Sequence, residues 1–445
     1  MDDESLDLSS LYTQHLQVLA TRFDRALADC GFDGLIVHSG ALSALFRDDQ
    51  THPFRADAWF KAWVPVTDTP DCFLYYEPGR KPLVLFHRPV DYWYKPSEPP
   101  QSYWTERVEV ILVADRAAAR AALPRNLGRI AYLGAPLPEL ALWEVSASNP
   151  APLLSRLDYD RAVKTPYELE CLRRANRLAA RGHRAAARAF RQRASEYEIE
   201  LAFLEACAAR EQDLPYNPII ALNENGATLH YQRLERAAPA PMRSLLIDAG
   251  AESLGYASDV TRTHARAKSE FASLIERFDE VQQVLCSGVH AGVDWRDVHL
   301  SAHRLVAEFL HDAEIVHCDA EEAVATGVSS VFFPHGIGHL LGLQVHDVGG
   351  HLRSPEGGEI PRPEDHPYLR LTRVLEEGFV VTMEPGIYFI EQLLAQARGD
   401  ARAARINWPR VASLACYGGI RIEDDLAVTA NGAENLTRDA FRAVR

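Results

Sequence analysis

The chain has 445 residues, a formal net charge of −15 and 47% hydrophobic residues. This length exceeds the size at which a single hydrophobic core usually stops growing, so two domains are expected. The negative charge argues against nucleic acid and anionic membrane surfaces as partners, because their phosphates would repel the protein. It leaves small neutral or zwitterionic molecules as the expected substrates.

The N-terminal residues are acidic and polar, and they lack the basic start and apolar run of a signal peptide. No apolar stretch approaches the length of a membrane span. The seven cysteines are scattered and have no CxxC spacing, which indicates reduced thiols rather than disulfides or a thiolate zinc site. We therefore expect a cytoplasmic protein.

The first third of the chain alternates a helical stretch with short apolar runs, which is typical of an α/β domain. The helix is expected over Leu11 to Cys30. The expected strands are Gly34 to His38, Cys72 to Tyr76, Pro82 to His87, Val108 to Val113 and Arg129 to Leu133. A proline-rich segment from Ala135 to Leu153 follows. We expect the domain boundary near Asp158, which gives domains 1–157 and 158–445.

The second domain begins with two helices that carry capping-box sequences. Thr165 to Glu168 starts a helix that runs to about Arg191, and Ser195 to Glu198 starts another that runs to about Glu211. Two further helices are expected over 269–290 and 295–311, and β-rich stretches over 244–248, 256–262, 379–382 and 419–428.

Two aspartates lie close together in the first of these β-rich stretches. Asp248 ends one apolar run and Asp259 lies in the next, with Gly250 and Gly255 in the connection. This spacing predicts a hairpin that brings both carboxylates to one cavity. In a chain with 62 acidic residues, the pair is by itself as easily a coincidence.

Later segments add further metal-binding side chains. His335 and His339 lie four residues apart among glycines, and His346 follows shortly after. A single histidine is more often structural, but this clustering favours a functional site. Glu384 and Glu423 each follow an apolar strand, where an acid must be solvated, paired or bound to metal.

Asp248, Asp259, His339, Glu384 and Glu423 together form a donor set of four carboxylates and one imidazole. Mostly hard oxygen donors favour Mn(II), while the imidazole leaves Zn(II), Co(II) and Fe(II) open. The set predicts a hydrolytic centre with two divalent metal ions.

In this order and setting, the five residues resemble the ligands of the pita-bread metallopeptidases, the family of methionine aminopeptidase, aminopeptidase P, creatinase and prolidase. Phe46 to Gln50, Phe60 to Trp63 and Pro89 to Trp93 look like parts of the N-terminal domain of bacterial prolidases. The resemblance implies an α/β N-terminal domain followed by an α+β pita-bread catalytic domain. It also implies that the substrate is an Xaa-Pro dipeptide.

The same resemblance assigns roles to the five ligands. Asp248 should chelate one metal, His339 and Glu384 the other, and Asp259 and Glu423 should bridge them. A hydroxide between the metals would attack the scissile carbonyl. Glu384 is also the candidate for carrying the proton towards the leaving nitrogen; the alternative is that it acts as a ligand alone.

Substrate recognition is implied for a further group of residues. Arg370 should bind the C-terminal carboxylate with His230 nearby, because a guanidinium matches a carboxylate bidentately. Without the resemblance, Arg370 would be interpreted as a solvated surface arginine. His346 should donate a hydrogen bond to the substrate carbonyl or the tetrahedral intermediate, and Arg421 should hold the site in place.

The remaining implied contacts concern the pocket wall and a second subunit. Tyr216, His335 and Val345 should line the pocket, although Tyr216 and Val345 could equally be core residues. Asp48 or Asp49, together with Trp93, should close the pocket of a partner subunit, which implies a homodimer.

Three other functions remain open at this point. Aminopeptidase P would keep the same metals and differ in the length of its substrate. Organophosphate hydrolysis is conceivable as a side activity. A non-catalytic pita-bread module that binds protein partners is the third, although such modules typically lose metal ligands and this chain retains all five.

Overall fold

The computed structural model describes residues 3–444 and contains two compact units. The first unit comprises the residues up to Cys171 together with Ser354–Gly358, and the second comprises the rest. The division lies within α6 (Pro166–Arg191), whereas the expected boundary near Asp158 lies within α5 (Ala151–Arg161). Because α5 packs against α1 (Asp3–Cys30), the whole of α5 belongs to the first unit.

A six-stranded mixed sheet forms the centre of the first unit, in the order β4-β3-β2-β1-β5-β6. Its strands are β1 (Gly34–His38), β2 (Phe73–Tyr76), β3 (Leu83–His87), β4 (Glu109–Val113), β5 (Ile130–Leu133) and β6 (Ala147–Ser148). Every residue of β1, β2 and β5 is buried, which explains why these strands appear in the sequence as uninterrupted apolar runs. The five strands predicted in this region are confirmed.

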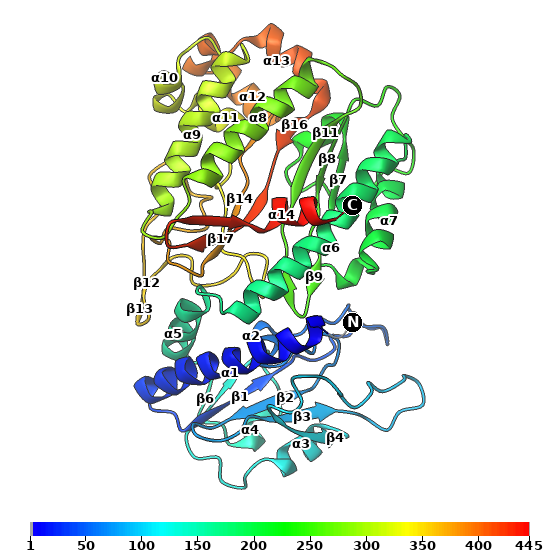
Figure 1. Ribbon diagram of the computed structural model, residues 1–445, viewed down its shortest axis with the longest axis vertical. Helices are drawn as coiled ribbons and strands as arrows, with labels where there is room; N and C mark the ends of the chain where they lie inside the picture. Colours follow the sequence, from blue (N-terminus) through cyan, green and yellow to red (C-terminus); the bar gives the residue numbers. More distant parts are fainter. Residues whose placement is uncertain (1–2, 445) are drawn as a thin grey trace. The chain divides into compact units, whose positions relative to one another are not determined.

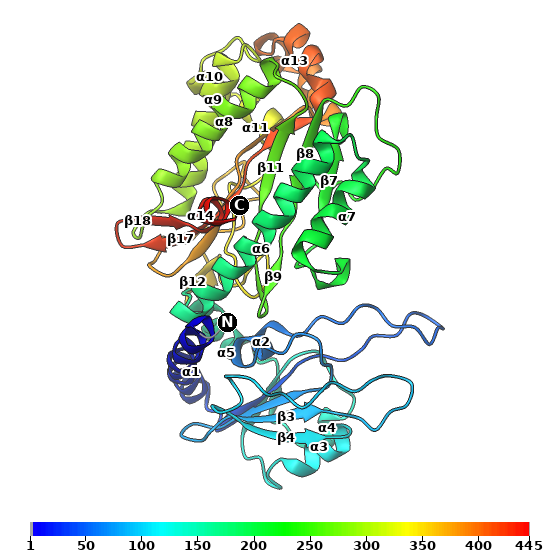
Figure 2. The same ribbon diagram turned by 45° about the vertical axis from the view of Figure 1, so that its right-hand side comes forward.

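Helices cover both faces of this sheet (Figures 1 and 2). On one face, Phe23 of α1 packs edge-on against Trp59 and Trp63 of α2 (Ala58–Trp63). On the other, α3 (Arg116–Ala122) and α4 (Leu140–Trp143) bury residues such as Trp143 against the strands. The sequence analysis did not predict α2 to α5, because helices this short present too few turns for a clear apolar period.

Three small antiparallel sheets build the second unit. The first has the order β11-β8-β7, the second β14-β17-β18, and the third pairs β15 with β16. The strands are β7 (Ile219–Leu222), β8 (Ser244–Asp248), β11 (Thr261–Ala265), β14 (Val380–Met383), β15 (Gly386–Tyr388), β16 (Gly419–Arg421), β17 (Asp424–Thr429) and β18 (Gly432–Asn435). Two minor hairpins lie outside these sheets, β9 (Glu252–Ser253) with β10 (Tyr256–Ala257) and β12 (Leu352–Ser354) with β13 (Gly357–Glu359). The second of them includes the Ser354–Gly358 segment of the first unit.

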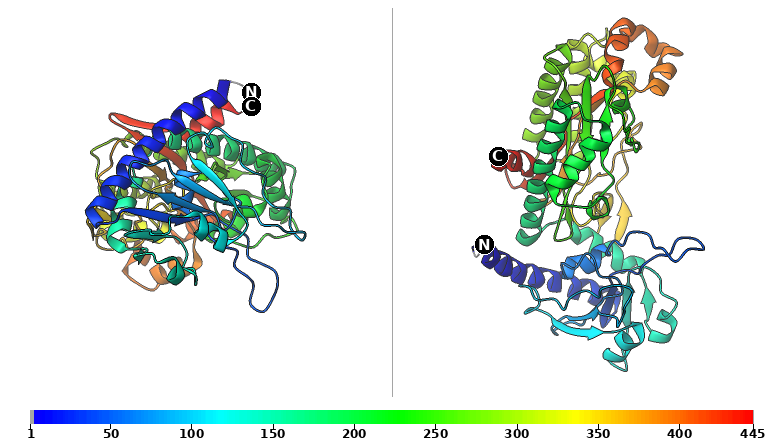
Figure 3. Two further views of the ribbon diagram at one scale, coloured as in Figure 1. Left: turned by 90° about the horizontal axis from the view of Figure 1, so that it is seen from below. Right: turned by 90° about the vertical axis from the view of Figure 1, so that its right-hand side faces the viewer.

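Helices flank these sheets on two sides, as Figure 3 shows from the side. Phe190 of α6 and Phe203 of α7 (Glu196–Cys207) belong to a buried apolar cluster with Ile220 and Ile247 of β7 and β8. The other helices are α8 (Glu270–Ser287), α9 (Trp295–Asp312), α10 (Ala320–Ala325), α11 (Val328–Phe332), α12 (Glu391–Arg398), α13 (Trp408–Leu414) and α14 (Leu436–Ala443). No helix among residues 3–444 combines the length and apolarity needed to cross a membrane.

Both predicted capping boxes are present. The Thr165 backbone N–H donates to Glu168 at 2.8 Å, and Ser195 and Glu198 make the equivalent pair of bonds. The first helix ends at Arg191 as predicted. The second ends at Cys207 rather than near Glu211, because Ala208 adopts a left-handed conformation that terminates it.

The predicted aspartate hairpin forms, with one addition. β8 and β11 pair antiparallel, and Asp248 lies opposite Thr261. Between them, β9 and β10 form a smaller hairpin, and Asp259 lies just before β11 rather than on it. Gly250 permits the close return of the chain, since a Cβ atom there would lie 1.9 Å from the carbonyl oxygen of Ser258.

A buried ion network fastens the C-terminal helix to the second unit. Arg438 of α14 contacts Asp424 of β17 and Asp279 of α8, each at 2.6 Å, and Arg262 reaches Asp424 at 2.6 Å. Burial opposes ionisation of Asp424, but the two arginines outweigh burial and lower the pKa of its carboxyl. The buried charge therefore depends on both arginines.

We predict that Arg438→Met lowers the free energy of unfolding by about 3–5 kcal/mol, because it leaves a buried carboxylate without one of its partners. Arg442→Met on the same helix is the matched control; its ion pair with Asp439 is exposed, so the change should be within about 0.5 kcal/mol. The loss in free energy of unfolding caused by Arg438→Met should shrink as the pH falls below about 4. The Asp424 carboxyl, whose pKa is lowered in the folded protein, stabilises the fold only while it is ionised. Urea unfolding at pH 7 and in acid measures both effects, and equal stability of the two variants would contradict the network's importance.

Candidate active site

A cavity of about 930 Å³ lies in the second unit, between the ends of the small sheets. Its lining includes all five residues predicted as metal ligands. It also includes every substrate contact predicted in this part of the chain, namely Tyr216, His230, His335, Val345, His346, Arg370 and Arg421. Residues spread over nearly half of the sequence are thus brought to one place.

Strand ends position the five predicted ligands. Asp248 is the last residue of β8, Glu384 directly follows β14, and Glu423 lies between β16 and β17. Single β-bridges tie these ends together, since Thr261 pairs with Glu423 and Leu340 pairs with Val381. The β-bridge at Leu340 fixes the neighbouring His339. Rigid attachment of this kind is what a metal site needs to keep its ligand geometry.

Donor atoms of Asp259, His339 and Glu423 lie within 4.8 Å of one another. His339 Nε2 is 3.3 Å from Asp259 Oδ2 and 3.8 Å from Glu384 Oε1. The Nδ1–H of His339 donates to the Leu340 carbonyl at 2.9 Å, which leaves Nε2 directed at the carboxylates. This chemistry fits divalent cations, because several oxygens and one imidazole nitrogen converge on a small buried volume.

The electrostatics of the cluster also favour a cation. Burial, with neighbouring carboxylates, raises the pKa of Glu423 well above its usual value and that of Glu384 to about 7. Burial opposes protonation of His339, yet its bond to Asp259 and the nearby charges raise its pKa to about 9. The buried acids therefore repel one another, and either protons or cations must neutralise them.

Arg421 is buried and holds the acidic cluster from behind. It donates to Asp248 at 2.7 Å, to the Tyr388 hydroxyl at 3.0 Å and to the Thr261 hydroxyl at 3.2 Å. The Tyr216 hydroxyl donates to the other oxygen of Asp248 at 2.8 Å. Both oxygens of this carboxylate are thus held in place, as expected if Arg421 positions the site rather than reacting.

Several residues around the site were missed in the sequence analysis. Thr261 donates to Glu423 at 2.7 Å, the Thr382 hydroxyl accepts from the His339 backbone, and Asp425 accepts from the Asp259 backbone N–H. A signal for them exists, because each lies two residues from a predicted ligand on an extended chain. Side chains at i and i+2 share one face of a strand, so this spacing could have identified them.

Three further side chains that line the cavity carry nitrogen groups, namely His346, Arg370 and His230. The rings of His346 and His339 meet edge to face with centroids 4.5 Å apart. Burial and the neighbouring His339 lower the pKa of His346 to about 4, so its ring is neutral near pH 7. Within residues 3–444, the side chains of Arg370 and His230 make no hydrogen bond or ion pair. They are therefore available to a ligand.

Asp48, Asp49 and Trp93 belong to the first unit and do not line this cavity. Asp48 lies in an exposed turn closed by the bridge between Ala44 and Thr51. Trp93 is 77% exposed and stacks beside Tyr92, which is 87% exposed. Two adjacent aromatic side chains with this degree of exposure are unusual on a protein without a partner.

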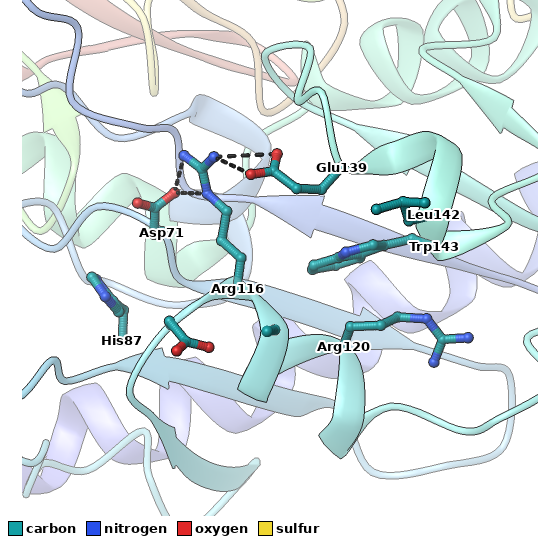
Figure 4. A pocket seen from close by; sticks show the side chains of 9 residues that line it. Asp71, His87, Arg116, Arg120, Glu139, Leu142 and Trp143 are labelled. Carbon is teal, nitrogen blue, oxygen red and sulfur yellow. Dashed lines mark hydrogen bonds and ion pairs between the residues drawn. The ribbon is translucent and has the colours of Figure 1, made fainter.

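The first unit contains a second cavity, of about 590 Å³ (Figure 4). Arg116 extends into it, but its guanidinium is paired with Asp71 at 2.8 Å and with Glu139 at 3.1 Å. Two carboxylates therefore neutralise this cation.

Comparisons with known proteins agree with this geometry. Residues 10–159 match the family model of the Xaa-Pro dipeptidase N-terminal domain, and residues 170–430 match that of metallopeptidase family M24. The chain belongs to metallopeptidase family M24. An Xaa-Pro dipeptidase of Xanthomonas campestris is 50% identical over 98% of this chain and 99% of its own. One of Stenotrophomonas maltophilia is 47% identical over 98% of each chain.

Solved structures share the fold of this chain. Aminopeptidase P from E. coli with the inhibitor Pro-Leu aligns with a TM-score of 0.70 and 22% identity over 95% of each chain. This similarity confirms the expected architecture of an α/β N-terminal domain and an M24 pita-bread catalytic domain. M24 metallopeptidases use divalent metals, and the acidic cluster described above suits such ions.

Proposed function

We propose that this metallopeptidase is a dipeptidase that cleaves the bond before the proline of Xaa-Pro dipeptides. One observation carries the proposal: a free guanidinium, that of Arg370, lines the same cavity as a buried cluster of acids suited to metal. The cluster accounts for hydrolysis, and the cation accounts for a substrate that ends in a carboxylate. Near-full-length relatives that are named Xaa-Pro dipeptidases support the same substrate.

In this proposal, Asp248 would bind one divalent ion, and His339 and Glu384 would bind the other. Asp259 and Glu423 would bridge the two ions. When bound, these ions would acidify water and polarise the scissile carbonyl. Mn(II) is favoured by the four carboxylates, with Co(II) and Zn(II) as alternatives.

The protein's own groups carry the proton and orient the substrate. Glu384 would take the proton from the attacking water and deliver it to the proline nitrogen, because a carboxylate beside two cations stays ionised and lies next to the reacting atoms. The neutral ring of His346 would donate a hydrogen bond to the carbonyl oxygen as negative charge develops there. Arg370, with His230, would hold the C-terminal carboxylate.

Substrate length separates this proposal from aminopeptidase P activity. After loading with Mn(II), we expect cleavage of Gly-Pro and Leu-Pro and little cleavage of Xaa-Pro-Yaa tripeptides, since an added residue removes the carboxylate from the reach of Arg370. Initial rates on both substrate sets measure this. Preferential cleavage of the tripeptides would replace the dipeptidase with an aminopeptidase P. A slow hydrolysis of organophosphate triesters is proposed as a side activity of the same centre and can be measured in the same assay.

We also propose a homodimer in which the exposed loop around Trp93, with Asp48 or Asp49, closes the active-site cavity of a second copy. The exposure of Tyr92 and Trp93 supports this. Trp93→Ala is expected to weaken dimerisation in analytical ultracentrifugation and to raise KM, with Leu142→Ala as an equally exposed apolar control. A monomeric wild-type protein would contradict the proposal. The seven free thiols suit a reducing compartment, and we propose the cytoplasm.

A further inference from the structure

Three histidines form a buried cluster outside the acidic centre. His299 and His303 lie one turn apart on α9, and His366 lies in the segment between β13 and β14. The centroids of the three rings form a nearly equilateral triangle with sides of 4.7, 4.6 and 4.6 Å. His299 and His303 are only 1% and 2% exposed, respectively.

We propose that His299, His303 and His366 bind one further transition-metal ion, with Zn(II) as the best fit. One ring nitrogen from each residue lies within 4.8 Å of the other two, and the closest pair is 3.0 Å apart, between His299 Nε2 and His366 Nδ1. Nitrogens around a tetrahedral zinc ion lie about 3.4 Å apart when each bond is about 2.0–2.1 Å long. Small rotations of the rings would reach this geometry.

The hydrogen bonding of the cluster suits a metal better than a purely structural core. His303 Nδ1 pairs with the Ser329 hydroxyl at 3.1 Å, which holds the ring and leaves its Nε2 available. His299 Nδ1 is buried and has no hydrogen-bond partner. Two buried imidazoles in contact with a half-buried third, one of the buried rings being incompletely bonded, are costly unless a ligand compensates.

The charge state and donor type define the class of ion. Burial and mutual repulsion lower the pKa of His299 to about 2 and that of His303 to about 3, so both rings are neutral, which is the form that binds metal. The nearest influential acid is Asp365, beside His366. Three imidazoles without a carboxylate favour Zn(II), Ni(II) or Cu(II) over Mn(II), which prefers oxygen. The proposed ion therefore differs in class from those of the acidic centre.

The position of the cluster gives the ion a structural role. His366 precedes Pro367, Tyr368 and Arg370, which line the active-site cavity. A metal joining His366 to α9 would fasten the segment that carries Arg370 to a rigid helix. The site would hold the proposed carboxylate-binding arginine in place without contacting the substrate.

Metal analysis of the full-length chain tests this inference separately from the proposed activity. The test uses the Asp259→Asn/Glu423→Gln double variant, in which the acidic centre is disabled. This variant is incubated with Zn(II) and Mn(II) and gel-filtered, and the number of metal ions per chain is then measured by elemental mass spectrometry. We expect about one Zn(II) and no Mn(II) per chain. Adding His303→Asn should remove that zinc, whereas adding His311→Gln, on the same helix with its ring bonded to the Cys318 carbonyl, should retain it.

Two further measurements guard against a variant that fails to fold. His366→Gln changes the least buried ligand, and circular dichroism should match that of the double variant while the zinc is lost. Loading the double variant with Co(II) should give the strong visible absorption of a tetrahedral site, and His366→Gln should abolish it. A double variant that retains no zinc, or a folded His303→Asn or His366→Gln variant that still retains it, would overturn the inference.

Discussion

Asp259→Asn and Glu423→Gln are each expected to lose bound divalent metal and at least about 1,000-fold of kcat/KM on Gly-Pro, equivalent to about 4 kcal/mol of transition-state stabilisation. Each substitution removes one negative charge from the position proposed to bridge two cations. Neither an amide nor the remaining acids can replace that charge. Elemental analysis of the purified variants and initial rates under Mn(II) measure the two losses together.

The losses of bound metal and of activity should follow from the missing negative charge and not from unfolding. The Gln side chain at position 423 keeps a carbonyl oxygen that can accept the 2.7 Å hydrogen bond from Thr261, so the fold should persist. Glu364→Gln makes the same change at an exposed position and should retain both metal and activity. Unchanged metal content in both ligand variants would defeat the dinuclear centre.

Arg370→Ala is expected to lower kcat/KM on Xaa-Pro dipeptides about 30- to 150-fold, mainly through KM, and to leave the metal content unchanged. This corresponds to about 2–3 kcal/mol, the range for a charge-assisted hydrogen bond. The guanidinium has no partner of its own in residues 3–444, so the loss reports on the substrate contact and not on a broken internal bond. Steady-state kinetics with metal analysis measures both quantities.

A matched substrate provides the control for Arg370. A dipeptide with an amidated C-terminus has no carboxylate, so it should be a poor substrate for the wild type and should lose little further with Arg370→Ala. Arg370→Lys keeps the charge but not the planar fork, and should recover part of the loss. Equal losses on the free and amidated peptides would refute carboxylate binding by Arg370.

The sequence predicted the fold wherever a local pattern determines it. The five strands of the first unit appear as apolar runs because the sheet is covered on both faces, and the capping boxes at Thr165 and Ser195 mark true helix starts. Helices of four to eleven residues, such as α3 and α5, were missed because tertiary contacts stabilise them more than any period of their own. The division within α6 has no signal in the sequence, since a continuous helix carries no composition change at the point where contacts separate.

The ligands of the site were predictable from the sequence, but most of the residues that hold them in place were not predicted. Its four acids and one histidine follow family motifs, and the structure brings all of them to one cavity. The residues that hold them depend on pairing between distant strands: Thr261 reaches Glu423 only through the β-bridge between their strands, and Tyr388 meets Arg421 only because β15 pairs with β16. The histidine cluster was likewise missed, because His366 and His299 become neighbours only in the folded chain.

The β-bridge between Thr261 and Glu423 has a consequence for how the protein is made. During synthesis, Asp248 and Asp259 leave the ribosome long before Glu423, so the emerging chain presents repelling acids with no completed ligand set. Capture of the proposed ions would therefore follow translation of β16 and its neighbours, and the ions would lock early and late segments of the second unit together. A cell short of the proposed divalent metal would then accumulate not only inactive enzyme but also a less firmly closed chain, more exposed to proteolysis.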